Sequence, residues 1–237
     1  MKVIQPNCRI QFTAEDIAFI VTTLRKGDEQ TQLIRDLLTD AHARDLMLED
    51  ERLYRAVLED SACLQISQHL YFYILSRHSL KKAGLDDRQV ADYVAEVLSE
   101  YSQWEKTRCR LPGEDTPLDY CFEMVGALQR VDERTRFCLR THIGNHTLFF
   151  AGLFAARIKD RAERKGFPDL GYYESLGQAN YRIASDHRLA TRYDLSHVLG
   201  TLGEGFHHAR MALNDMADRL LHLGDDGQPL PAFIRAA

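Results

Sequence analysis

The strongest constraint on the fold is a series of apolar residues near the C-terminus with alternating spacings of four and three. The series is Leu195, Leu199, Leu202, Phe206, Ala209, Leu213, Met216 and Leu220. Because an α-helix has about 3.6 residues per turn, this spacing keeps the whole series on one side of a helix. We call it the heptad series. We expect one long helix from Asp194 to His222 that buries this side.

A second stretch, LRTHIGNHTLFFAGLFAA (139–156), has the same spacing, but a histidine stands at one of its apolar positions. The positions on this side are Leu139, Ile143, His146, Phe150 and Leu153. The most polar positions are Arg136, Arg140, Gly144 and Thr147. His142 lies one turn before His146, and Asn145 lies on the other flank. We expect a central helix over Asp132–Lys165 in which His146 is buried and His142 and Asn145 are largely buried.

Helix-start signals recur along the chain, whereas strand patterns are nearly absent. Thr13, with Asp16 three residues later, has the form of a capping box. The clearest interruption is Lys106–Pro117, which holds two prolines and a glycine and shows no periodicity. We therefore predict an all-α protein, a compact bundle of about nine helices around the long central helix. We expect a single domain over 1–237, with a subdivision near 106–117 as the alternative.

The composition excludes several classes of protein. The net charge is −5 and no basic cluster extends beyond a helical turn or two, which argues against nucleic acid as a partner. The longest apolar run, Leu148–Ala156, is about half as long as a membrane-spanning helix. The five cysteines are scattered, odd in number and without a CxxC pair, and the N-terminus lacks a secretory signal. We expect a cytoplasmic protein without a membrane partner.

The most familiar motif is Glu204-x-x-His207, one half of the ligand set of a ferritin-like di-metal site. Such oxygen and imidazole ligands suit iron, manganese or zinc. They must project into the bundle, however, and Glu204 and His208 each lie about 160° around the helix from Phe206. The motif is therefore predicted to be a solvated polar face with a Glu204–His208 pair, and a metal site is the alternative.

His142 and His146 offer a second metal hypothesis, because two imidazoles four residues apart on an inward side can share one ion. A third protein ligand would have to come from another helix. The candidates for it are His69, Glu123 and Glu174. Two other interpretations stay open. One is a buried polar network that satisfies a neutral His146 and Asn145, and the other is a pocket for a small ligand.

Three further side chains are candidates for contact with a ligand. Tyr73 and Arg77 lie four residues apart on the apolar stretch QHLYFYILSRHSL (68–80). An arginine there can pair with a buried carboxylate or bind the acid group of a ligand. The alternative is an arginine whose stem is buried and whose head reaches water. Glu174 shares a helix face with Tyr181, and the alternative there is a packing helix with tyrosine hydroxyls at its boundary.

Common catalytic and nucleotide-binding motifs are missing, since GxSxG, GxGxxG and GxxxxGK[ST] do not occur. We therefore expect a binding, scaffold or regulatory protein that self-associates, for example as a homodimer, or binds a protein partner. The alternative is an enzyme or sensor with a buried pocket beside His142, Asn145 and His146. That pocket would hold a small ligand or a metal ion.

Overall fold

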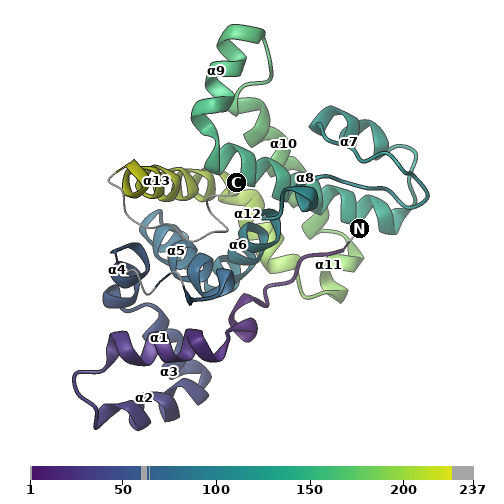
Figure 1. The fold of residues 1–237 in the computed structure, drawn as a ribbon. Coiled ribbons are helices and arrows are strands. Elements are labelled where there is room, and N and C mark those ends of the chain that lie inside the picture. Colours follow the sequence, from purple (N-terminus) through teal and green to yellow (C-terminus); the bar gives the residue numbers. More distant parts are fainter. Residues whose placement is uncertain (1, 60–62, 64, 226–237) are drawn as a thin grey trace.

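Helices form all the named elements in the part of the chain that the structure describes, residues 2–59, 63 and 65–225 (Figure 1). In this computed structural model the α-helices are α1 (Ala14–Leu24), α2 (Gln30–Thr39), α3 (Ala41–Leu48), α4 (Glu51–Glu59), α5 (Gln68–Lys82), α6 (Arg88–Tyr101), α7 (Cys121–Ala127), α8 (Glu133–Leu153), α9 (Ala155–Lys165), α10 (Leu170–Ser185), α11 (Arg188–Arg192), α12 (Ser196–Glu204) and α13 (Phe206–Asp225). Two short 3-10 helices are η1 (Cys8–Gln11) and η3 (Trp104–Thr107). The predicted all-α class is confirmed. The expected count of about nine helices is too low, since the described residues form thirteen α-helices.

The heptad series is buried as predicted, but it lies on two helices instead of one. All its members, from Leu195 to Leu220, are at most 8% exposed. Gly205 leaves the helical conformation between α12 and α13, with φ −95° and ψ 18°. A Cβ atom there would lie 2.7 Å from Cδ2 of Leu85, so the close contact at this bend depends on glycine. The continuous helix expected over Asp194–His222 is therefore wrong, although its buried side is right.

The central helix is also shorter than predicted. α8 ends at Leu153, because Phe154 departs from helical geometry with φ −123° and ψ 33°. The chain then turns into α9, which projects from the body of the molecule at the top of Figure 1. The rod expected over Asp132–Lys165 is thus two helices. Their bend brings Phe150 of α8 and Ile158 of α9 to the wall of one cavity.

α8 is buried on nearly all sides, because glycines let the neighbouring helices approach closely. A Cβ atom at Gly144 would lie 2.6 Å from the ring of Tyr181 on α10, and one at Gly152 would lie 2.7 Å from Leu213 on α13. Thr147 is fully buried, and its hydroxyl donates to carbonyl oxygens of its own helix. The expectation that Gly144 and Thr147 belong to a polar side is therefore wrong, since that side packs against α10.

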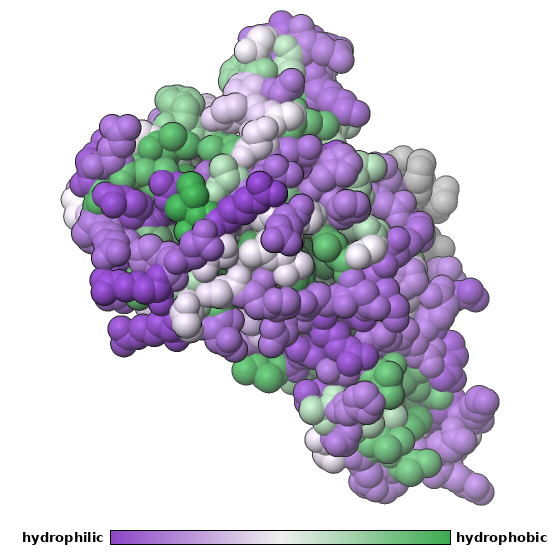
Figure 2. Space-filling model, turned by 180° about the vertical axis from the view of Figure 1, so that it is seen from behind, coloured by the Kyte–Doolittle hydropathy of each residue, from purple (hydrophilic) through white to green (hydrophobic). Residues whose placement is uncertain are grey.

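The helices on either side of Lys106–Pro117 contribute to one large hydrophobic core, whose members range from Ile4 to Leu220. Helices α1, α2 and α3 form a lobe at the lower end of the molecule in Figure 1. Exposed apolar side chains on this lobe include Leu33, Leu37 and Leu46. Figure 2 shows apolar surface on the same lobe from behind. The core therefore joins both sequence halves, and the lobe exposes apolar surface.

None of the helices within the described ranges combines the length and the apolar character needed to cross a bilayer. The apolar run Leu148–Ala156 is instead divided between α8 and α9. In α8, Leu148 and Phe149 are buried in the protein core. This run therefore serves packing inside the protein.

Candidate functional site

The segment that contains η3 lies against α8 and separates two cavities. His142 and Asn145 border a cavity of about 360 Å³. His146 borders a cavity of about 470 Å³. Arg108, directly after η3, lines both cavities. His142 and Asn145 thus border one cavity, and His146 borders the other.

His142 is held by hydrogen bonds at both ring nitrogens. Its Nε2 donates to the carbonyl oxygen of Thr107 at 3.1 Å, and its Nδ1 accepts from the hydroxyl of Tyr101 at 2.9 Å. These roles are assigned from the partners, because a carbonyl can only accept. Burial lowers the pKa of His142 to about 4, so the ring is neutral near pH 7. With both nitrogens engaged, this ring has no lone pair left for a metal ion.

Asn145 is the centre of a buried tyrosine cluster. Its side-chain oxygen accepts the hydroxyl hydrogens of Tyr93 on α6 at 2.9 Å and of Tyr181 on α10 at 2.8 Å. Both tyrosines are fully buried, so one amide oxygen satisfies two hydroxyl groups that water cannot reach. The buried polar network that the sequence suggested for His146 and Asn145 is thus present at Asn145, whereas the histidine with strong partners at both nitrogens is His142 and not His146.

His146 has a weaker partner and a different neighbourhood. It is 6% exposed, and its Nδ1 lies 3.5 Å from the sulfur of Cys121 on α7. A thiol is a weak donor, and with Nδ1 accepting, the ring proton stands on Nε2. Burial and the neighbouring His142 lower the pKa of His146 to about 3. His146 is thus a neutral imidazole beside a cavity, with its Nε2–H unpaired by any hydrogen bond found among the described residues.

Cys121 and His146 do not form a catalytic thiolate and imidazolium pair. Such a pair needs a thiol whose pKa is lowered and a histidine that holds the proton. Here burial raises the pKa of Cys121 to about 12, while it lowers the pKa of His146. Both groups are therefore neutral near pH 7, and the contact is suited to packing rather than to nucleophilic attack.

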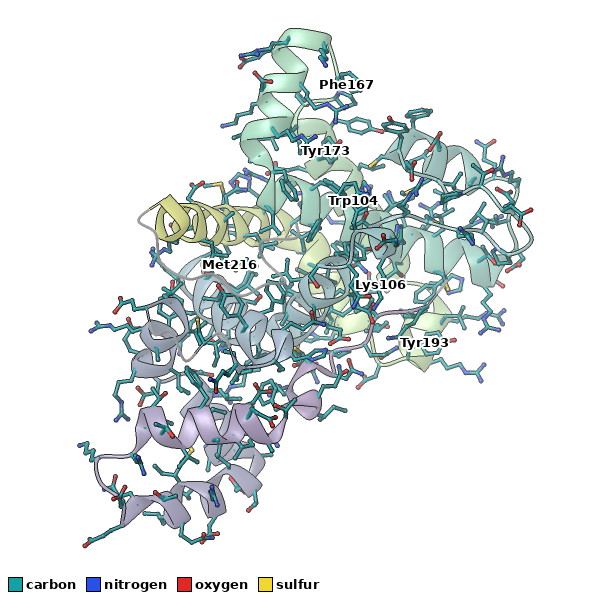
Figure 3. The ribbon with its side chains drawn as sticks, viewed as in Figure 1. Trp104, Lys106, Phe167, Tyr173, Tyr193 and Met216 are labelled. Atoms are coloured by element: carbon teal, nitrogen blue, oxygen red, sulfur yellow. The ribbon has the colours of Figure 1, made fainter. Side chains whose placement is uncertain are left out.

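The cavity beside His146 combines aromatic rings with guanidinium groups, and we call it the arginine–aromatic cavity. Its aromatic lining consists of Trp104, Tyr120, Phe150, Phe154 and Tyr173. Its charged lining consists of Arg108, Asp119, Arg157 and Arg161. Figure 3 shows Trp104 at η3 and Tyr173 on α10, from which both side chains reach this cavity. The walls thus come from segments far apart in the sequence.

Tyr73 and Arg77 lie outside both cavities. Tyr73 is fully buried, with the guanidinium carbon of Arg9 5.5 Å from its ring centroid. Arg77 is 4% exposed and donates to Glu49 at 2.9 Å and also to Asp86. Its buried head is thus paired with two carboxylates, that of the largely buried Glu49 and that of the exposed Asp86. The alternative of a head that reaches water is wrong for this arginine.

Glu174 connects α10 to α13 and lines neither cavity. It accepts hydrogen bonds from Nδ1 of His207 at 2.9 Å and from Arg210. Burial opposes the ionisation of Glu174, but these two hydrogen bonds lower its pKa overall. Because Arg210 is itself buried, Glu174 serves to compensate its charge. The predicted ligand contact is thus an ion pair between helices.

The residues considered as metal ligands do not gather into one site. Glu204 and His208 are both exposed, on the side of the helices away from the heptad series. Over residues 2–59, 63 and 65–225, no three His, Cys, Asp or Glu side chains form a group that could hold a metal ion.

The candidates for a third ligand have other partners. His69 approaches a carboxylate oxygen of Glu96 at 3.7 Å. Glu123 accepts from the backbone N–H of Tyr120 at 3.0 Å, as part of the N-terminal cap of α7. The described residues therefore supply no ligand from these helices to complete a site at His142 and His146.

No sequence pattern singled out the arginines of the arginine–aromatic cavity. Arg157 directly follows the apolar run Leu148–Ala156. A signal was present, since Arg157 and Arg161 are four residues apart and Ile158 lies between them on the same side. Nothing in the sequence shows that this side faces Trp104, because that depends on the bend at Phe154.

Comparison with known proteins gives no family assignment: no family model, no curated protein and no solved structure matches the chain. The function is therefore argued from geometry.

Proposed function

We propose that this protein binds a small organic molecule in the arginine–aromatic cavity and acts as a ligand-responsive regulatory protein. The observation that carries the proposal is the environment of His146. It is a buried, neutral imidazole that borders a cavity of about 470 Å³ and keeps its Nε2–H unpaired among the described residues. Cavities of this size, with rings for packing and a few polar groups for orientation, are typical of small-molecule sites.

The same geometry favours binding over chemistry. The neutral Cys121 and His146 offer no activated nucleophile. The cavity walls come from η3, from α8 and α9, and from α10, so a ligand would contact all of them at once. A ligand that contacts α9 and α10 together would restrain the projecting helix, which is how binding would be transmitted to a partner. We place this activity in the cytoplasm, in line with the scattered cysteines.

The test uses the single tryptophan of the chain, Trp104, which lines the cavity. The neutral fluorophore N-phenyl-1-naphthylamine accepts energy from tryptophan, so its binding quenches Trp104 only when it lies close. We expect one saturable site on the full-length protein. The variant Ile158→Phe, which adds a ring to the cavity wall, should weaken binding about tenfold. The control Met211→Phe lies on an exposed position of α13 and should leave binding unchanged.

Two results would each reject the proposal. Absence of quenching of Trp104 in the wild-type protein, both by this probe and by its sulfonated analogue 8-anilinonaphthalene-1-sulfonate, would reject the proposal. Quenching that Ile158→Phe and Met211→Phe leave equally strong would place the probe elsewhere and would also reject it. Thermal unfolding of each variant serves as the check that Ile158→Phe is folded.

Self-association through the α1–α3 lobe is a second candidate function. Leu33 and Leu37 lie one turn apart on α2 and are 58% and 38% exposed, and Leu46 on α3 is 53% exposed. An exposed apolar group of this kind favours a protein interface. The heptad series cannot serve as one, because the chain buries it internally. Light scattering during size-exclusion chromatography tests this, and a monomer at micromolar concentration would reject the homodimer.

A further inference from the structure

Three arginines line the arginine–aromatic cavity, and the protein neutralises only one of them. Arg108 forms two parallel hydrogen bonds with Asp119, of 2.5 and 2.9 Å. Neither Arg157 nor Arg161 has a carboxylate at ion-pair distance among the described residues. The cavity therefore carries excess positive charge, although the chain as a whole has a net charge of −5.

Helix α9 does not itself neutralise the positive charge of its two cavity arginines. Arg157 and Arg161 are four residues apart, which puts two like charges on one side of the helix and weakens it. Ile158, on the same side, lines the cavity with them. The helix contains two acids, but Asp160 pairs with Arg164 at 2.6 Å and Glu163 forms no ion pair with either arginine among the described residues. An anion in the cavity would relieve the repulsion that the helix itself leaves uncompensated.

Arg161 is also positioned for binding by an aromatic neighbour. Its guanidinium carbon lies 4.3 Å from the ring centroid of Phe167, in a cation–π contact. Stacking occupies the flat face of the guanidinium and leaves the N–H groups at its edge for hydrogen bonds. This planar fork matches the two oxygens of a carboxylate or a phosphate. Arg157 is exposed and can add a second charge at the same end of the ligand.

The remaining walls suit a flat apolar body. Phe150, Phe154 and Tyr173 contribute rings to the cavity, and an aromatic ligand can pack against them in offset or edge-to-face contacts. His146, whose ring lies 4.4 Å from that of Phe150, adds one N–H donor. A ligand would thus be apolar along these rings and anionic towards α9.

We infer that the ligand is an organic acid with a flat aromatic body and a carboxylate or phosphate group that Arg157 and Arg161 bind together. This inference rests on the proposed function, since it names the chemistry of the ligand for the same cavity. Arg108 stays paired with Asp119 and shapes the cavity wall.

The test compares two probes that differ mainly in one charged group. 8-Anilinonaphthalene-1-sulfonate has the rings of N-phenyl-1-naphthylamine and a sulfonate in addition. We expect the sulfonate to quench Trp104 at a concentration at least about tenfold lower than the neutral probe. The double variant Arg157→Gln/Arg161→Gln should weaken sulfonate binding about tenfold or more and change neutral-probe binding less than about twofold. The control Lys159→Gln removes a positive charge from an exposed position of the same helix that forms no ion pair among the described residues, and it should change neither.

A second measurement needs no variant. Raising sodium chloride from about 50 mM to about 500 mM should weaken binding of the sulfonate and spare the neutral probe. Naphthalene-2-carboxylate and 2-naphthyl phosphate, used as competitors, should displace the sulfonate where 2-naphthol does not. The acid that competes at the lower concentration identifies the headgroup.

The failures of the two proposals can be told apart. Equal affinity of both probes, unchanged by Arg157→Gln/Arg161→Gln and by salt, would overturn the anion inference and leave the binding proposal standing. An equal loss in Lys159→Gln would assign the effect to general charge and would also overturn it. If neither probe quenches Trp104, the proposed function itself fails.

Discussion

His142 and His146 stand one turn apart on the same helix, yet their surroundings differ. His142 has a strong hydrogen-bond partner at each ring nitrogen, from Tyr101 and Thr107. His146 has one weak thiol partner and a cavity on its other side. Burial makes both rings neutral near pH 7. Burial and charge therefore do not distinguish the two histidines, whereas the number and strength of their hydrogen-bond partners do.

The same contrast runs through the helix as a whole. On the side that carries Asn145, the polar groups satisfy one another inside the core. On the side that carries His146, the protein leaves a donor, rings and uncompensated cations around a space. We read the first side as stabilising the fold and the second as available to a ligand.

Asn145→Leu should have the largest effect, because it removes the acceptor of two buried hydroxyls. Tyr93 and Tyr181 would each lose their partner in a place that water does not reach. We expect the free energy of unfolding to fall by about 4 kcal/mol. Urea unfolding followed by circular dichroism measures it.

A combined variant sharpens this prediction. Adding Tyr93→Phe and Tyr181→Phe to Asn145→Leu removes the hydroxyls along with their acceptor, so more than about half of the loss should be recovered. A loss below about 1 kcal/mol in Asn145→Leu alone would contradict the structural role of this side.

His142→Leu should cost about 2 to 3 kcal/mol, since it leaves the Tyr101 hydroxyl and the Thr107 carbonyl without partners. Tyr101→Phe removes one of the two hydrogen bonds and should cost about 1 kcal/mol. Because both variants break the same hydrogen bond, the double variant should cost less than the sum of the two. Strict additivity in urea unfolding would show that the ring and the hydroxyl are not coupled.

The apolar spacing predicts which side of a helix is buried, but it does not predict where a helix bends. Burial was predicted correctly for all members of the heptad series, because the spacing of apolar residues indicates directly which side of a helix is buried. The bend at Gly205 was not predicted, since a glycine within an amphipathic pattern is compatible with a straight helix. The bend at Phe154 had no distinctive local signal, because the nearby Gly152 is explained by its close packing against Leu213 and the other neighbours are apolar.

The candidate site was predictable in part for the same reason. His142, Asn145 and His146 could be placed on a buried side by counting along one helix. That Asn145 meets Tyr93 and Tyr181, while His146 meets Cys121 and a cavity, depends on contacts between distant segments. Gly144 and Thr147 show the limit most clearly, because they are among the most polar positions of the pattern and yet admit the close approach of α10.

Acid should weaken the fold through both histidines, and the sign follows from the direction of their pKa shifts. Each pKa is lowered from 6.5, to about 4 for His142 and about 3 for His146. Above pH 6.5 both rings are neutral in the folded and unfolded chain, so their contribution to stability is complete. As the pH falls below 6.5, the unfolded chain takes up protons first. Each ring then removes about 1.4 kcal/mol per pH unit until the folded pKa is reached.

Carboxylates also take up protons as the pH falls, so a variant is needed to isolate the contribution of His142 to the pH dependence of stability. The stability difference between wild type and His142→Leu should shrink as the pH falls from about 7.5 to about 5, by about 1.4 kcal/mol for each unit below the unfolded pKa. Urea unfolding at several pH values measures it. A difference that stays constant over this range would show that His142 titrates in the folded chain as it does in the unfolded one.

His146→Leu should have the smallest effect on stability, below about 1 kcal/mol near pH 7.5, because only a weak thiol contact is lost and leucine fits an apolar neighbourhood. At about pH 5 the variant should even be more stable than wild type, since it no longer has a buried imidazole that resists protonation. Binding should be affected more than folding. An anionic probe with a hydrogen-bond acceptor should quench Trp104 less strongly, because the His146 N–H donor is lost although the fold is intact. If His146→Leu instead costs as much as His142→Leu, both histidines are structural, and the contrast on which the binding proposal rests disappears.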